Sequence, residues 1–193
     1  MFIDLFRERF RERECEGYVL DLGCGPGDIT FRFARAYPCC KVHGVDGSPA
    51  MLACGRTLLE AGADGADRIE FYEGVLPATD LPIDRYDVVI SNSLLHHLQN
   101  AGVLWDSVKR FAAAGAPVFI MDLVRPASRA EAESMVATYA AAEAAVLQQD
   151  FFHSLLAAYS LPEVRAQLVL SGLDYLDVKQ VSDRHMFISG IFR

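Results

Sequence analysis

The sequence lacks any long apolar run, internal repeat or segment of low complexity. A membrane-spanning helix needs about 18 or more consecutive apolar residues, and no stretch approaches that length. The amino-terminal segment also lacks the character of a secretory signal, because acidic residues interrupt its apolar positions: Asp4, Glu8, Glu12 and Glu14. These absences predict one cytoplasmic domain over residues 1–193, with no membrane partner.

Clusters of lysine and arginine are also absent. The formal net charge is -8 at pH 7, and the densest group of arginines, between residues 7 and 13, alternates with glutamates. An acidic surface repels a phosphate backbone, so nucleic acid is a poor candidate partner.

Cysteine is scarce: the chain has five, and none form a C-x-x-C pattern. An odd number without that spacing disfavours both a disulfide framework and a zinc site. Adjacent Cys39 and Cys40 could form a redox pair, but two reduced thiols are the expected state in a reducing compartment.

What the sequence does contain is a regular alternation of apolar runs and amphipathic segments. The runs predict strands at 18–22, 41–46, 69–72, 86–91 and 117–123. Helices are expected near the amino terminus, at 29–37, from Pro49 onward with Ser48 as its cap, and at 101–114. Such alternation is typical of a parallel sheet with helices on both faces.

The alternation stops after residue 126. Ser128 and Glu131 form a capping-box pattern, which predicts an alanine-rich helix to about residue 148. A second helix is expected over 151–159 and a third between Ser160 and Gly172, before closing strands at 175–181 and 185–192. We expect this helical insertion, residues 127–172, to cover the carboxyl ends of the strands and to shape a substrate pocket.

The segment VLDLGCGPGD places three glycines directly after the first strand. Gly23, Gly25 and Gly27 permit positive φ and leave room for a ligand close to the backbone. The dinucleotide pattern G-x-G-x-x-G would need its third glycine where the chain has Asp28. A carboxylate at that helix start would repel a pyrophosphate, so NAD is disfavoured and a cofactor without phosphates fits better.

An acidic residue, Asp46, follows the second strand. Its carboxylate is placed to accept hydrogen bonds from both hydroxyls of a ribose. The alternative is that Asp46 only caps the turn into the next helix. Ser48 already fits that capping role, which favours ribose binding.

Four segments resemble the successive motifs of the class I S-adenosylmethionine-dependent methyltransferases: VLDLGCGPG, VDGSPAML, YDVVISNSLLHHL and VFIMDLVRP. They occur in that family's order and spacing, over residues 19–126. The resemblance implies a doubly wound α/β fold of three layers, with a mainly parallel seven-stranded sheet whose last strand is antiparallel. It also implies methyl transfer from S-adenosylmethionine, with S-adenosylhomocysteine as product and a cofactor-binding core over residues 17–126.

The resemblance also implies where this cofactor binds. Asp21 would orient the methionine amino group, and Asp46 would bind the ribose. The glycine turn, the residues near adenine and the backbone at the methionine end supply the other contacts: Gly23, Cys24, Gly25 and Gly27; Gly47 and Met51; Ser91 and Asn92. Where the family usually has an Asp for the adenine amino group, this chain has Val75 and Leu76, so adenine would rest on backbone groups and apolar packing.

Transfer of an activated methyl group needs alignment and exclusion of water, and a general base only where the acceptor carries a proton. His96 is the candidate base, whereas His97 is expected to pack in its loop or face solvent. Ser91, Asn92 and Ser93 stand where a catecholate-type site would need carboxylates, so no metal is expected.

The insertion supplies candidates for an acceptor pocket: Phe151, Phe152, His153 and Tyr159. The alternative is that these residues pack onto the sheet. Arg125 could bind an acidic acceptor, but pairing with Asp122 or with glutamates of the next helix is preferred.

The expected acceptor is a small molecule, and the expected assembly is a monomer or a homodimer. Two other functions stay open at this point. One is a module that binds S-adenosylmethionine without catalysis, and the less favoured one is an NAD-dependent oxidoreductase.

Overall fold

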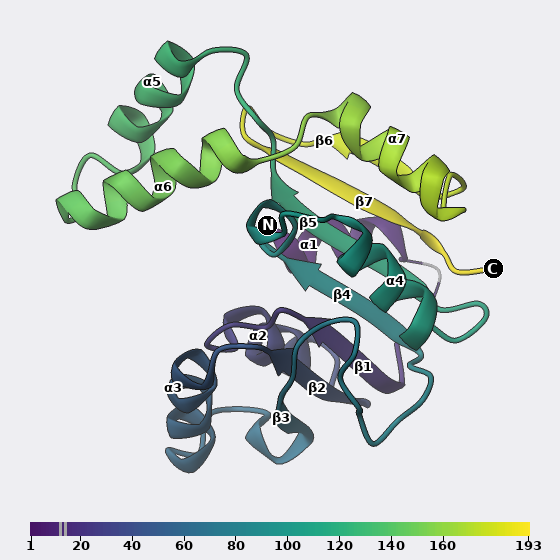
Figure 1. Ribbon diagram of the computed structural model, residues 1–193. Coiled ribbons are helices and arrows are strands. Elements are labelled where there is room, and N and C mark those ends of the chain that lie inside the picture. The colour runs from purple at the N-terminus through teal and green to yellow at the C-terminus, as the bar shows by residue number, and fades with distance from the viewer. Residues whose placement is uncertain (12, 14) are drawn as a thin grey trace.

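The computed structural model describes residues 1–11, 13 and 15–193. Its centre is a seven-stranded sheet of order β3-β2-β1-β4-β5-β7-β6 (Figure 1). The strands are β1 (Gly17–Leu22), β2 (Cys40–Asp46), β3 (Ile69–Glu73), β4 (Val88–Asn92), β5 (Pro117–Leu123), β6 (Asp177–Gln180) and β7 (His185–Ile191). Strands β1 to β5 pair in parallel, and β7 runs antiparallel to both β5 and β6. The predicted fold class is therefore confirmed.

Helices cover both faces of the sheet and give three layers. The first face carries α1 (Phe2–Arg9), α2 (Asp28–Ala36) and α3 (Pro49–Glu60), and the second carries α4 (Gly102–Phe111) and α7 (Leu161–Ser171). Two short 3-10 helices, η1 (Ala66–Arg68) and η2 (Leu95–His97), lie in the connections. None of the described helices is long and apolar enough to cross a membrane.

Alternation along β5 divides the core between the two faces. Phe119 is fully buried and meets the rings of Phe2 and Phe6 from α1 at centroid distances of 5.0 and 5.7 Å. The neighbouring Ile120 belongs instead to the cluster around Trp105 of α4. Because successive strand residues point to opposite faces, a single strand anchors both helical layers.

The strand order reverses at β1, which lies between β2 and β4. The chain leaves β1 toward β2 and β3, then crosses back to β4 and β5 on the other side. In open parallel sheets, ligands bind in the crevice beyond the carboxyl ends of strands at such a switch point. The fold thus directs attention to the loops that follow β1, β2 and β4.

The inserted segment has the three expected helices, but the first two divide at a different place. It forms α5 (Arg129–Tyr139) and α6 (Ala145–Ala157), which pack on each other as a hairpin beyond the carboxyl end of β5 (Figure 1). The prediction of a helix to about residue 148 is wrong because the chain turns at Ala140, whose carbonyl accepts from Glu143 N. The side chain of Gln148 caps this turn by donating to the carbonyls of Ala141 and Glu143.

The fourth strand also starts later than the predicted 86–91. Tyr86 pairs with Ala112, at the end of α4, as an isolated bridge, and its N–H donates to Phe111 O. The backbone of Tyr86 is therefore engaged by the end of α4, and regular pairing with β1 begins only at Val88.

Replacement of Phe119 tests how far α1 contributes to the core. Phe119→Ala removes the ring that α1 packs on, so we expect the free energy of unfolding to fall by about 3–5 kcal/mol. Urea denaturation followed by circular dichroism measures the change. Leu170→Ala, at a position 88% exposed on α7, is the matched control and should stay within about 0.5 kcal/mol of the parent. A small loss for Phe119→Ala would show that α1 packs loosely.

Candidate functional site

The turn after β1 depends on its glycines. Gly23, Gly25 and Gly27 have φ angles of 69°, 55° and 90°, which only glycine adopts readily. A Cβ on Gly23 would meet the Leu94 side chain at 2.7 Å, and one on Gly27 would meet the Phe71 ring at 2.6 Å. Gly25 faces open space instead. The turn therefore presents bare backbone to the crevice at the switch point.

The carboxylate of Asp46 ties this turn to the next helix. One oxygen accepts from Gly25 N at 2.8 Å and the other accepts from Ser48 N at 2.8 Å. Ser48 in turn caps α3 by accepting from Met51 N at 3.4 Å. Asp46 thus has a structural role at the turn, and each carboxylate oxygen has further lone pairs for a ligand.

Two buried acceptors at the site have no hydrogen-bond partner among the described residues: Asp21 Oδ1 and Asn92 Oδ1. The other Asp21 oxygen accepts from the Thr30 hydroxyl at 2.7 Å. Burial raises the pKa of Asp21 to about 7, and the negative charge of Asp46 adds to this increase, while the Thr30 hydrogen bond opposes it. An N–H donor, above all a cationic one, would satisfy both acceptors.

These groups line one cavity of about 490 Å³. Seven residues that the sequence predicts as cofactor contacts lie around it: Asp21, Gly23, Cys24, Gly25, Asp46, Met51 and Asn92. Asp28, at the start of α2, adds a third carboxylate, and no lysine or arginine is among the described lining residues. The cavity therefore favours a cationic or neutral ligand over one with phosphates.

The other predicted contacts lie outside this lining. Gly27 packs on Phe71, and Ser91 is buried with its hydroxyl donating to Leu22 O at 2.7 Å. Gly47, Val75 and Leu76 are not among the residues that line the cavity, and Val75 is 74% exposed. The lining also includes residues that we did not predict: Pro26, Asp28, Ile29, Ser48, Ser93, Leu94 and His97.

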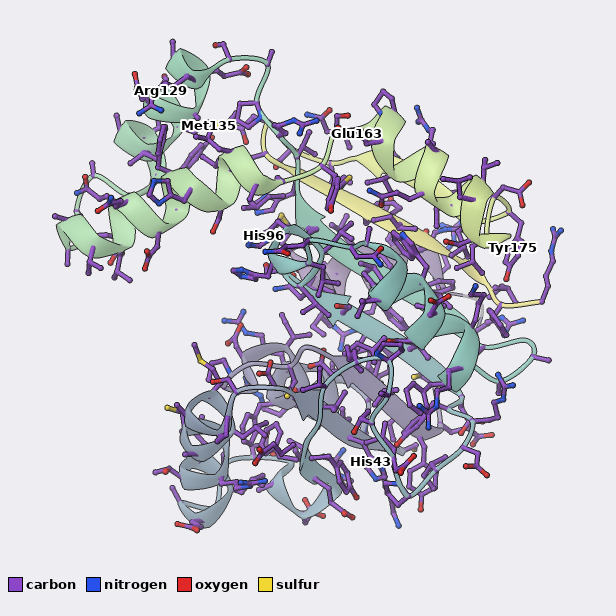
Figure 2. The ribbon with its side chains drawn as sticks, viewed as in Figure 1. His43, His96, Arg129, Met135, Glu163 and Tyr175 are labelled. Atoms are coloured by element: carbon purple, nitrogen blue, oxygen red, sulfur yellow. The ribbon has the colours of Figure 1, made fainter. Side chains whose placement is uncertain are left out.

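The two histidines of η2 have opposite surroundings. His97, which was expected to pack or face solvent, lines the cavity, and its pKa is lowered by burial and by the neighbouring His96. His96 is buried, with Nδ1 2.6 Å from a carboxylate oxygen of Asp122. The ring centroids of the two histidines lie 4.1 Å apart. Figure 2 shows His96 at the side of the sheet where β5 ends, below α6, which contacts η2.

Asp122 is itself held in place at the end of β5. Its carboxylate accepts from Leu95 N and from Leu123 N, both at 2.7 Å. A carboxylate fixed in this way selects the His96 tautomer whose Nδ1–H donates to it, which leaves Nε2 as a proton acceptor.

The aromatic residues of the insertion lie away from the cavity. Phe151 and Phe152 pack within the α5–α6 hairpin, with the Arg129 guanidinium 4.7 Å from the Phe152 ring, and His153 is exposed. The Tyr159 hydroxyl donates to Leu98 O at 2.9 Å. Their proposed role around an acceptor gains no support from this arrangement.

Arg125 pairs with Glu163 at the start of α7, and not with Asp122 or the glutamates of α5. Glu163 also caps α7 by accepting from the N–H and hydroxyl of Ser160. The expected pairing was wrong because the end of β5 lies against the start of α7, with Arg125 N donating to Tyr159 O.

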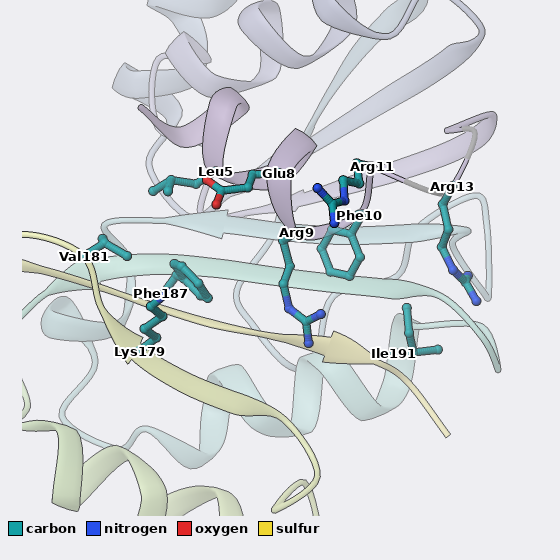
Figure 3. A pocket seen from close by; sticks show the side chains of 10 residues that line it. All are labelled: Leu5, Glu8, Arg9, Phe10, Arg11, Arg13, Lys179, Val181, Phe187 and Ile191. Carbon is teal, nitrogen blue, oxygen red and sulfur yellow. The ribbon is translucent and has the colours of Figure 1, made fainter.

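A second cavity, of about 510 Å³, lies between α1 and the β6–β7 edge (Figure 3). Its floor is apolar, with Phe187 and Ile191 from β7. Arg9 at its rim is already bound to Ser189 and Asp177, at 3.0 and 2.9 Å. This cavity contains none of the predicted site residues, so we place the candidate site at the glycine turn.

Comparison with known proteins agrees with this placement. The Methyltransferase domain family matches residues 19–115. Trans-aconitate 2-methyltransferase from Variovorax paradoxus is 35% identical over 127 residues, which cover 65% of this chain and 45% of that protein. The enzyme of the same name from Streptomyces avermitilis is 37% identical over 78 residues, covering 40% and 28%. The matched segments thus span less than half of these curated relatives.

Solved structures share the fold across nearly the whole chain. A SAM-dependent methyltransferase from Aquifex aeolicus superposes with a TM-score of 0.69 at 18% identity, covering 97% of this chain and 89% of that one. The plantazolicin methyltransferase BpumL, in complex with a monoazolic desmethylPZN analog and SAH, gives 0.72 at 15% identity, covering 100% and 81%.

The sheet order and the glycine-turn cavity define a Rossmann-like domain of the methyltransferase class. With the match over residues 19–115, the chain belongs to the Methyltransferase domain family. The resemblance drawn from the four sequence motifs is confirmed.

The raised pKa of Asp21 predicts a pH dependence of stability. The folded-state pKa of about 7 lies above the ordinary value of 3.8, so the folded protein holds a proton that the unfolded chain releases. The free energy of unfolding therefore falls as pH rises from about 4 to about 7, and this contribution is constant above that range. Asp21→Asn keeps the shape of the side chain and an acceptor for Thr30, but removes the ionisation.

We expect Asp21→Asn to gain stability relative to the parent between about pH 5 and about pH 8, by on the order of 1–3 kcal/mol. Urea denaturation at both pH values measures the difference. Asp64→Asn, at an exposed position, is the control and should show no such pH-dependent gain. A constant difference for Asp21→Asn would show that Asp21 titrates normally.

Proposed function

We propose that this chain transfers the methyl group of S-adenosylmethionine to a small-molecule acceptor and releases S-adenosylhomocysteine. The observation that carries the proposal is the pair of unpartnered buried acceptors, Asp21 Oδ1 and Asn92 Oδ1, in a cavity beside three left-handed glycines. A methionine amino group offers the cationic N–H donors that these two oxygens lack.

The remaining features of the cavity fit the rest of this cofactor. The Asp46 carboxylate keeps lone pairs for ribose hydroxyls, and the bare backbone at Gly25 lets a ligand approach closely. Met51, 48% exposed at the cavity edge, offers an apolar surface for adenine. Gly47 and Val75 lie beside each other just beyond it, since a Cβ on Gly47 would be 3.9 Å from the Val75 side chain.

The charge distribution separates this cofactor from a dinucleotide. Asp21, Asp28 and Asp46 line the cavity, and Asp28 is paired with Arg32 at 2.9 Å. Asp46, together with Asp21 when it is ionised, therefore favours a sulfonium cation and an ammonium group. Asp28 stands at the start of α2, where the pyrophosphate of NAD would need the helix amino terminus free of negative charge. The oxidoreductase alternative is disfavoured for this reason.

We further propose that His96 is the general base and that Asp122 positions it. A bound S-adenosylmethionine supplies the activated methyl group. His96 Nε2 would take the proton from the acceptor, while Asp122, through Nδ1, fixes the tautomer and stabilises the imidazolium that results. This role implies an acceptor atom that carries a proton, such as a hydroxyl.

The names of the relatives guide the choice of test acceptors. Trans-aconitate is a small carboxylic acid, and a panel of small hydroxylated and carboxylated compounds that includes it is the reasonable starting set. The expected cytoplasmic location, the monomeric or homodimeric state and the acceptor roles of Phe151, Phe152, His153 and Tyr159 stay predictions.

Calorimetry tests the cofactor directly. S-adenosylhomocysteine should bind more tightly than NAD, and Asp46→Ala should weaken its binding by about 1.5–3 kcal/mol because two hydrogen bonds to a charged acceptor are lost. Asp64→Ala, away from the cavity, is the control and should leave binding unchanged. Tighter binding of NAD would contradict the proposed function. Unchanged binding of S-adenosylhomocysteine by Asp46→Ala would show that Asp46 only stabilises the turn and does not contact the cofactor.

The His96–Asp122 pair makes a separate prediction about turnover. His96→Ala should lower kcat for a hydroxyl acceptor found in the panel by about 10²–10⁴-fold, because that is the usual contribution of a general base. Asp122→Asn should also lower kcat, since the amide no longer selects the tautomer. The measurement is S-adenosylhomocysteine formation, with calorimetric binding of the same compound as control. Full activity of both variants would show that the His96–Asp122 pair has only a structural role.

A further inference from the structure

Two cysteines far apart in the sequence meet at the amino-terminal edge of the sheet. Cys40 is the first residue of β2 and is fully buried, and Cys15 lies two residues before β1 and is half-buried. Their sulfur atoms are 3.2 Å apart. A disulfide joins sulfurs at about 2 Å, so the two atoms need to approach by only about 1 Å to form a bond.

The sheet register brings this pair together. Gly17 of β1 is the partner of Cys40 in β2, so the segment that leads into β1 passes beside the start of β2. Cys39, the neighbour of Cys40 in the sequence, is exposed. The sequence offered Cys39 as a possible but unfavoured redox partner of Cys40, whereas the sulfur that lies beside Cys40 belongs to a residue 25 positions away.

The surroundings differentiate the two thiols. The Arg68 guanidinium donates to the carbonyl of Cys40 at 3.3 Å and to that of Ala34 at 2.7 Å, which holds a positive charge beside the pair. The hydrogen bond between the two thiols and the charge of Arg68 lower the pKa of Cys40, and burial opposes them, whereas the same hydrogen bond and burial raise the pKa of Cys15. Cys40 is thus the thiol that ionises more readily, whereas Cys15 is the more accessible of the two.

A small oxidant has a route to Cys15. A cavity of about 240 Å³ lies beside it and is lined by Cys15, Glu16 and Asp87 together with parts of α1 and of the loop before β5. This cavity is separate from the candidate cofactor site, whose own cysteine, Cys24, is not part of its lining.

We propose that Cys15 and Cys40 form an oxidative modification site, at which a peroxide converts the two thiols to a disulfide. The Cys15 sulfur, which lines this cavity, gives up its proton and attacks one peroxide oxygen, which breaks the O–O bond and gives a sulfenic acid and water. The Cys40 thiolate then attacks the sulfenic sulfur, forming the S–S bond and expelling hydroxide, which takes up a proton to give a second water. The two thiols lose two electrons in total, and the peroxide takes them.

The disulfide would fasten the amino-terminal helix to the sheet. The segment between α1 and β1 would be joined covalently to β2, while the other end of α1 lies near the candidate site. Met1 and Phe2 share a cavity of about 460 Å³ with Ile29 and Asn92, and both of the latter also line the cofactor cavity. Oxidation would therefore restrict a helix whose start lies beside two residues of the site, whatever cofactor the site binds.

The test is treatment of the purified protein with hydrogen peroxide, followed by intact mass spectrometry after alkylation of the remaining thiols. The parent should lose two hydrogen atoms and two alkylation sites, and dithiothreitol should restore both. Cys15→Ser should abolish this change, whereas Cys39→Ser, the matched control next to Cys40, should retain it. Cys40→Ser should also abolish the change. If Cys40→Ser fails to fold, Cys15→Ser, at a half-buried position, still tests the proposal.

Thermal unfolding supplies a second measurement. Closing a loop of 25 positions should raise the Tm of the oxidised parent by about 7–14 °C over the reduced protein, and Cys15→Ser should show no such rise. Loss of the mass change in Cys39→Ser, or its persistence in Cys15→Ser, would overturn the proposal by assigning the bond to another pair. Neither result depends on cofactor binding, so the failure of this proposal and of the proposed function are distinguishable.

Discussion

The carboxylate of Asp46 holds together the two turns that form the candidate site. It receives the N–H of Gly25 on one side and that of Ser48 on the other, both at 2.8 Å. The carbonyl of the preceding residue, Val45, accepts hydrogen bonds from Gly23 N and Cys24 N, so the glycine turn is hydrogen-bonded to the end of β2. The register between β1 and β2 therefore positions the backbone that forms the cavity. A ligand that binds Asp46 would bind the residue that also holds Gly25 and Ser48 in place.

The parts of this site that the sequence predicts are those encoded by local chemistry. The three glycines predict positive φ because no other residue adopts it readily, and Ser48 with Pro49 predicts the start of α3. The resemblance of four motifs to a known family implied the arrangement of the sheet. The sequences of the individual strands do not indicate which strands are neighbours. The break between α5 and α6 was not predictable, because the residues at 140–144, four alanines and one glutamate, all favour a helix, and only packing of the hairpin interrupts it.

Other features depend on partners distant in the sequence. The motif LLHHL offers two adjacent histidines, and nothing local indicates which one faces the cavity. The turn of η2 decides this by directing His96 toward Asp122, 26 positions away, and His97 toward the glycine turn. The cysteines follow the same logic: the sequence offers Cys39 and Cys40 as neighbours, but the register of a parallel sheet selects a different partner for Cys40.

The unpartnered oxygens of Asp21 and Asn92 link stability to binding. A buried acceptor without a donor costs on the order of 1–3 kcal/mol, and two of them border the same cavity. An apolar replacement would remove that cost but would also remove two buried oxygens that can receive an ammonium group there. A ligand that supplies these donors stabilises the folded state alone, since the unfolded chain has no such cavity. It also favours the ionised form of Asp21, so its binding should lower the pKa that burial has raised. The cost of burying these two acceptors and the binding of a ligand that supplies N–H donors thus depend on the same two oxygens, and the charge of ionised Asp21 favours a cationic donor.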